Sequence, residues 1–80
     1  MQAHILIQLK NGVLDPEAKA VENALKSLNF DGIRSLTMSK KVTITFEHND
    51  KQKALQDATK MAQELLANLV IEDFEIQIQE

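Results

Sequence analysis

The 80-residue chain contains no cysteine, tryptophan or tyrosine, and only one proline and two glycines. Without cysteine it has no disulfide framework, no thiolate metal site and no thiol nucleophile. Its three phenylalanines are the only aromatic residues, so few side chains are available for base stacking. Gly12 and Gly32 stand alone, and a phosphate-binding loop needs closely spaced glycines. Two turn glycines are therefore the favoured interpretation.

Neither charge nor hydrophobicity is concentrated in one part of the chain. The net charge is −3, with basic and acidic residues interspersed, which argues against a protein that binds phosphate backbones through a basic surface. No apolar run approaches the roughly 20 residues that cross a bilayer, and the first residues lack the basic segment of a signal peptide. We therefore expect a single cytoplasmic domain over residues 1–80, small enough to gain stability from a partner subunit.

The spacing of apolar residues predicts four strands and two helices. The predicted strands cover residues 3–9, 33–39, 41–47 and 70–78. Asp15 and Pro16 suit the cap and first turn of a helix that ends near Leu28. Asn49 and Asp50 begin a second helix, which continues to about residue 67.

The segment at Ser39-Lys40-Lys41 is the expected turn between the second and third strands, although it lacks glycine. The order strand-helix-strand-strand-helix-strand then predicts an α+β two-layer sandwich. Its sheet would be ferredoxin-like and antiparallel, with both helices on one face. Small residues on the second helix, with Ala54, Ala58 and Ala62 among them, should let that helix lie close to the sheet. Asn68 is expected to end it in a left-handed conformation.

No residue pattern forms a strong catalytic motif. His4 and His48 each stand alone near a strand end, so ordinary surface histidines are favoured over ligands or bases. Glu72 and Asp73 are adjacent in a strand and point to opposite faces, which favours exposed acids over a carboxylate pair or metal site. Lys40-Lys41 could hold a phosphate or an acidic partner, although a solvated turn is the default interpretation of two adjacent lysines.

Three blocks of the sequence resemble a known family. They are Val13-Leu14-Asp15-Pro16 with the helix after it, Ser39-Lys40 in the expected hairpin, and the run from Leu65 to Phe74. Together they are similar to the small subunit of phosphoribosylformylglycinamidine synthase, the PurS family, over nearly the whole chain. The sequence departs from the family pattern at four positions, where Gly, Gly, Pro and Tyr are usual: Ala18, Ser39, Leu69 and Phe74.

The resemblance implies a non-catalytic subunit of a ligase of purine biosynthesis. Such a subunit would form a homodimer or a higher oligomer, bridge a glutaminase subunit and a large ATP-dependent synthetase subunit, and assist ammonia transfer between them. The chain itself would hold no cofactor, catalytic residue or metal, while the complex would use ATP and Mg²⁺. Asp15, Pro16 and Lys40 are the candidate partner-contacting residues, and neither nucleic acid nor membrane is an expected partner.

Two other functions are open from sequence. A free-standing regulatory module with a ferredoxin-like fold would bind an amino acid or a nucleotide by itself. RNA binding through the open face of the sheet is disfavoured by the acidic balance and the shortage of aromatic residues.

Overall fold

The computed structural model describes residues 1–80 as one sheet, two α-helices and a short π-helix. In chain order the elements are β1 (Gln2–Leu9), α1 (Pro16–Ser27), β2 (Ser39–Thr45), α2 (Lys51–Met61), η1 (Ala62–Leu66) and β3 (Glu72–Gln79). The α+β class, with an antiparallel sheet and two helices, is confirmed. No helix combines the length and the apolar character needed to cross a bilayer.

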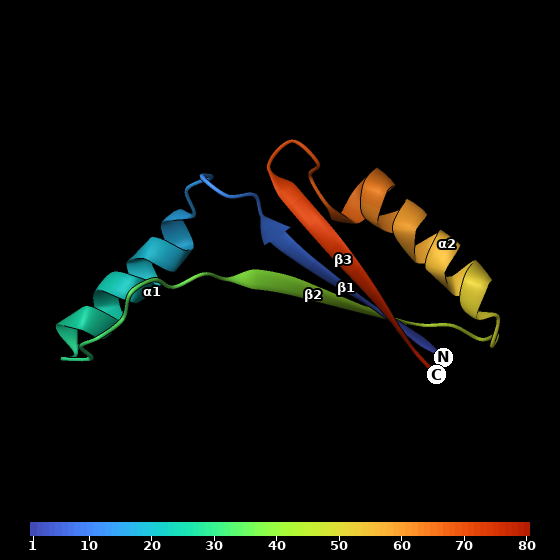
Figure 1. Ribbon diagram of the computed structural model, residues 1–80, viewed down its shortest axis with the longest axis horizontal. Helices are drawn as coiled ribbons and strands as arrows, with labels where there is room; N and C mark the ends of the chain where they lie inside the picture. The colour runs from blue at the N-terminus through green and yellow to red at the C-terminus, as the bar shows by residue number, and fades with distance from the viewer.

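The sheet has β1 at its centre, with β2 and β3 antiparallel on either side. Ile5 of β1 faces Val42 of β2 and Ile76 of β3, and successive side chains alternate between the two faces. One face lies under α2 (Figure 1) and carries the core. The other face is open and carries His4 and Leu6 from β1.

The core is small because α2 meets the sheet through alanines. Ala54, Ala58 and Ala62 are fully buried, as predicted from their spacing. They lie over β1, where Ile5 and Ile7 are the only large side chains that are completely buried. Short side chains let the helix backbone approach the strands closely, so little hydrophobic volume separates the two layers.

The end of the second helix differs from the prediction for Asn68, which does not adopt a left-handed conformation. The helix widens into η1, where the Ala67 N–H donates to the Ala62 carbonyl at 2.9 Å. The Asn68 N–H donates to the Glu72 carboxylate at 2.7 Å, and the Asn68 side-chain oxygen accepts from the Val70 N–H at 3.1 Å. Side-chain hydrogen bonds therefore make this turn.

α1 begins and ends where the sequence predicts. The Asp15 carboxylate accepts from the N–H groups of Glu17 and Ala18 at 3.0 and 3.3 Å, and Pro16 occupies the first turn. At the other end, Asn29 has a φ of 69°, and the Phe30 N–H donates to a carbonyl of the last turn. The left-handed asparagine that terminates a helix is thus Asn29.

The predicted hairpin at Ser39-Lys40-Lys41 is wrong, and so is the predicted strand over residues 33–39. These three residues belong to β2 itself and face Gln8, Ile7 and Leu6 of β1. Residues 33–38 run into β2 without a turn (Figure 1). A tight turn favours glycine or asparagine, and Ser-Lys-Lys offers neither. The chain therefore continues straight, and the sheet has three strands instead of four.

The straight passage carries α1 away from the sheet. α1 and residues 28–38 form a projecting arm beyond the end of β1 (Figure 1), so within one chain only α2 lies on the sheet. This corrects the prediction that both helices lie on one face. The molecule measures 48 × 26 × 15 Å, and only seven of its 80 residues are buried.

Candidate interaction surface

The three residues predicted to contact partners lie around one hollow in the surface. The hollow is where the chain leaves β1, between the start of α1, the start of β2 and the loop before β3. Asp15, Pro16 and Lys40 all line it. The Lys10 N–H donates to the Ile71 carbonyl at 2.8 Å and ties the two loops together. The fold thus brings together residues that are 25 positions apart in the sequence.

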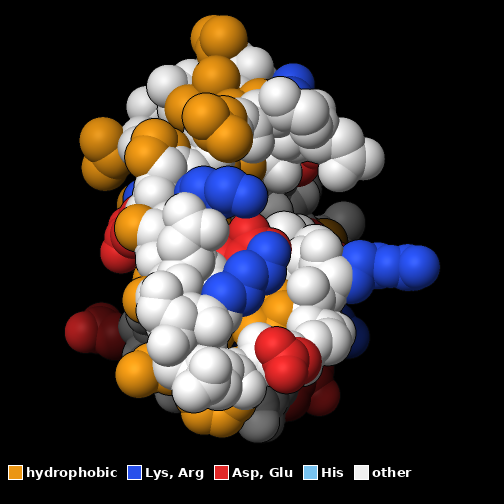
Figure 2. All heavy atoms as spheres, turned by 90° about the vertical axis from the view of Figure 1, so that its left-hand side faces the viewer, with side chains coloured by type: hydrophobic (Ala, Val, Ile, Leu, Met, Phe, Trp, Pro, Cys, Tyr) orange, Lys and Arg blue, Asp and Glu red, His pale blue; other side chains and the backbone are white.

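Large apolar side chains are exposed at and beside this hollow. Leu14 lines it and is 78% exposed, and Ile71 lines it from the loop before β3. Val70, next to Ile71 in the chain, is 83% exposed. Figure 2 shows hydrophobic side chains gathered at the top of the face on the α1 side. Exposed apolar clusters with polar neighbours are typical of protein–protein contact surfaces.

The two charged candidates differ in how far their groups are already engaged. The Asp15 carboxylate is bound to two backbone N–H groups, so its main local task is to cap α1. Lys40 is exposed and takes part in none of the four ion pairs of the chain. The Lys40 ammonium is therefore available to an acidic group on another molecule.

The histidines serve as hydrogen-bonding groups within the fold. The His4 Nδ1 lies 3.1 Å from the Thr43 hydroxyl, and its Nε2 lies 2.8 Å from the Gln79 side-chain oxygen. The His48 Nδ1 accepts from the Asp50 N–H at 3.1 Å. The two rings belong to separate networks, in agreement with their interpretation as ordinary surface residues.

The acidic pair before β3 is also divided between separate partners. Glu72 accepts from the Asn68 N–H, whereas the Asp73 carboxylate lies 3.9 Å from the Lys10 ammonium. No three His, Asp or Glu side chains are grouped so that they could hold a metal ion. The carboxylates of Glu72 and Asp73 are thus engaged by different groups, as adjacent strand residues that point to opposite faces should be.

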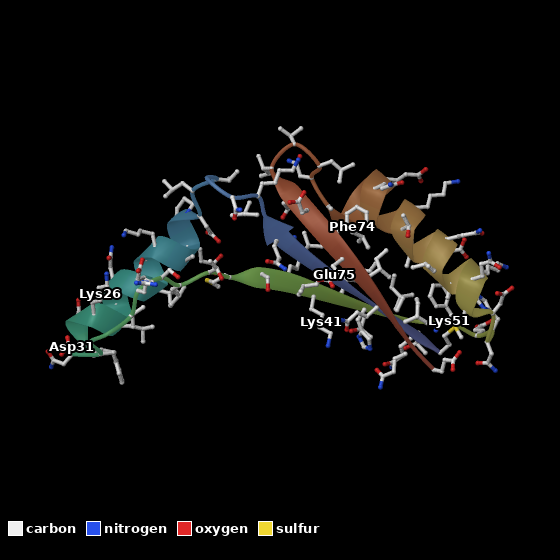
Figure 3. All side chains as sticks on the ribbon, in the orientation of Figure 1. Lys26, Asp31, Lys41, Lys51, Phe74 and Glu75 are labelled. Carbon is white, nitrogen blue, oxygen red and sulfur yellow. The ribbon has the colours of Figure 1, made fainter.

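The two faces of the sheet differ in character. Phe74 points toward α2 and packs against the core, whereas Glu75 and Lys41 lie on the open face (Figure 3). Both charged residues face Leu6 of β1 from opposite sides.

The sequence prediction misplaced the apolar residues before β3. It assigned Val70 to the strand, whereas β3 begins at Glu72. The turn at Asn68, whose side-chain oxygen accepts from the Val70 N–H, keeps these apolar residues out of β3.

Comparison with known proteins identifies the family. The PurS model, described as phosphoribosylformylglycinamidine (FGAM) synthase, matches residues 2–80. FGAM synthase subunit PurS of Methanocaldococcus jannaschii is 35% identical over 78 residues, which cover 98% of this chain and 94% of that one. The Bacillus subtilis PurS subunit is 33% identical over 76 residues, covering 95% and 89%.

Solved structures agree with the sequence matches. The crystal structure of Methanocaldococcus jannaschii PurS has a TM-score of 0.88 at 35% identity, covering 99% of this chain and 95% of that one. A chain of the PurLQS structure from Thermotoga maritima has a TM-score of 0.84 at 28% identity, covering 95% and 93%. Family model, sequence relatives and fold coincide over almost the full length, and the chain therefore belongs to the PurS family of FGAM synthase subunits.

Proposed function

We propose that this chain is the non-catalytic bridging subunit of an FGAM synthase in purine biosynthesis. It links the glutaminase subunit to the ATP-dependent synthetase subunit and assists the transfer of ammonia between them. The observation that carries the proposal is the match to PurS over residues 2–80. The similarity to a chain of the Thermotoga maritima PurLQS structure supports a role inside a complex.

The residues of the chain fit a supporting role in such a complex. A glutaminase of the thiol type needs a cysteine nucleophile, and this chain has no cysteine. ATP and Mg²⁺ would be held by the synthetase subunit, because the glycines here are too widely spaced for a phosphate-binding loop. The chain's own contribution is then to bind the two larger subunits in the correct arrangement.

The hollow around Asp15, Pro16 and Lys40 is the proposed contact with a larger subunit. Its exposed Leu14 and Ile71 would supply apolar contact area, and the unpaired Lys40 ammonium would meet an acidic side chain. We also propose that the chain acts as a homodimer or a higher oligomer, because its own core is small.

Reconstitution from the chain and the two larger subunits tests the role. The full mixture should make FGAM from glutamine, and omission of this chain should abolish most of that rate. The rate with ammonium salts as nitrogen source should persist, because it needs no transfer between active sites. A glutamine-dependent rate unchanged by the omission would refute the proposal. Tight binding of an amino acid or nucleotide by the chain alone would favour the regulatory-module hypothesis instead.

Charge reversal tests the proposed contact. Lys40→Glu should weaken assembly with a larger subunit and lower the glutamine-dependent rate, with most of the loss recovered at higher subunit concentration. Lys51→Glu, at the far end of α2 (Figure 3), is the matched control and should leave assembly unchanged. Asp15→Asn keeps an N-cap acceptor and removes the charge, so it separates the capping role of Asp15 from any contact. Equal behaviour of Lys40→Glu and Lys51→Glu would exclude the hollow.

A further inference from the structure

The connection from β1 to α1 (Figure 1) runs through Asn11 and Gly12. Asparagine is one of the thermolabile residues, because its amide can be attacked by a nearby nucleophile. Of the five asparagines in this chain, Asn11 alone is followed by glycine. The residues after the other four carry side chains that hinder access to their own backbone nitrogens: Ala24, Phe30, Asp50 and Leu69. Glycine leaves its backbone nitrogen open to close approach.

The fold holds Asn11 and Gly12 in an exposed turn. The Val13 N–H donates to the Lys10 carbonyl at 3.2 Å, and Gly12 has a φ of 85°, as the third residue of a type II turn requires. Apart from its chain neighbours, no atom lies within 4 Å of the place that a Cβ on Gly12 would occupy. A 3.2 Å hydrogen bond is at the long end of the N–H···O range. Rotation of the peptide between Asn11 and Gly12 therefore breaks only one long bond.

Neither of the two groups that would react is held by the fold. The Gly12 N–H donates to no acceptor in the protein, and the Asn11 side-chain amide makes no hydrogen bond. Asn68 is the contrasting case, because its side-chain oxygen accepts from the Val70 N–H at 3.1 Å and Leu69 follows it. Both residues are exposed, so the chain contains its own comparison.

We propose that Asn11 is a site of spontaneous covalent modification, at which the Gly12 nitrogen attacks the Asn11 side-chain amide. The nitrogen gives up its proton and bonds to Cγ of Asn11. The bond from Cγ to the amide nitrogen breaks, and that nitrogen leaves as ammonia with the added proton. Water then opens the resulting cyclic imide. Opening at the side-chain carbonyl gives aspartate, and opening at the main-chain carbonyl gives isoaspartate.

The modification changes the link between the sheet and α1. Both products add a negative charge at residue 11, and isoaspartate also lengthens the main chain by one carbon atom. The extra carbon lies inside the turn that the bond from Val13 to Lys10 closes. Val13 lines the hollow at the start of α1, so isoaspartate displaces one wall of the candidate contact. This consequence rests on the proposed function, whereas the modification itself does not.

Ageing the full chain in warm, mildly alkaline buffer tests the site. Peptide mass spectrometry measures amide loss at each asparagine, and labelling by an isoaspartyl methyltransferase detects isoaspartate. Asn11 should account for most of the amide loss, and Asn68 should stay intact. Asp31 also precedes a glycine with a φ of 85°, but it should react later because a carboxylate is attacked less easily than an amide.

Asn11→Gln is the matched variant. It keeps an exposed amide but must close a larger ring, so modification at residue 11 should nearly stop. Substitution of Gly12 is a poorer test, because a side chain is strained at its positive φ. The rate for the folded chain should also lie within about tenfold of the rate in urea, because opening an exposed turn costs little free energy.

Amide loss spread evenly over the asparagines, or unchanged by Asn11→Gln, would overturn the proposal. A folded chain that reacts far more slowly than the tenfold limit would show that the turn protects Asn11, and would overturn it too. Asn11→Asp has the added charge with an ordinary backbone and should assemble with the larger subunits normally, whereas the separated isoaspartate form should assemble less well. Equal assembly of these two forms would remove the consequence for the contact. Modification at Asn11 in a chain that fails to restore glutamine-dependent synthesis would refute the proposed function and leave the modification site in place.

Discussion

Replacing Ile5 with alanine should be among the most destabilising single truncations in this protein. Ile5 lies at the middle of the central strand, faces Val42 and Ile76, and has 0% of its surface exposed. Ala58 of α2 belongs to the same buried cluster. With strands on both sides and a helix above, the neighbouring atoms have little freedom to close the space that the substitution leaves.

The expected loss follows from two contributions. Ile5→Ala removes three carbon groups from a fully buried site, which costs about 2.4 kcal/mol at ~0.8 kcal/mol for each group. The cavity adds to this because the surrounding sheet and helix relax only partly. We therefore expect the free energy of unfolding to fall by about 3–4 kcal/mol, a large part of the stability of so small a domain.

Leu6→Ala is the matched control, because Leu6 is next in the strand and points to the open face. No helix covers it, so its loss should be below about 1 kcal/mol. Urea denaturation followed by circular dichroism measures both variants, at one protein concentration so that any association of chains affects both equally. Equal losses at the two positions would refute the assignment of one face as core and the other as open.

Three further substitutions have definite expected outcomes. Asp15→Ala should lower the free energy of unfolding by about 1 kcal/mol because it removes the α1 cap, and Asp15→Asn should recover most of this in the same denaturation assay. Ala58→Leu should cost about 1–3 kcal/mol or more by forcing α2 from the sheet, whereas Ala20→Leu on the exposed side of α1 should be near neutral in thermal melts. Phe74→Ala should cost about 2–4 kcal/mol, near the lower end of the range for core phenylalanines because the ring is only partly buried, while Glu75→Ala should change the urea midpoint little. A Phe74 loss as small as that of Glu75 would place the β3 register one residue out.

Several features of the fold were predictable because short-range chemistry determines them. Asp15 caps α1 since its carboxylate reaches N–H groups two and three residues away. Alternation along β1 fixed which face Ile5 and Ile7 occupy, and the spacing of alanines fixed the buried side of α2. The resemblance to PurS was likewise carried by the sequence, and the comparisons confirm it.

The candidate surface was predictable only in part. Asp15, Pro16 and Lys40 were chosen from sequence, but the hollow that joins them depends on how β1, β2 and the loop before β3 meet. The sequence prediction did not identify Leu14 and Val70 as exposed, because the residues around a hydrophobic side chain in the sequence do not show whether the fold will cover it.

The sequence by itself determined the type and faces of the elements, the caps and the family. Only the tertiary structure decided whether Ser39-Lys40-Lys41 turns back or runs straight. Residues on both sides of that segment alternate in the way of a strand in either case, and a turn without glycine is locally no better than a continued strand. The choice therefore depends on pairing with β1, which extends β2 to Ser39 and carries α1 away from the sheet.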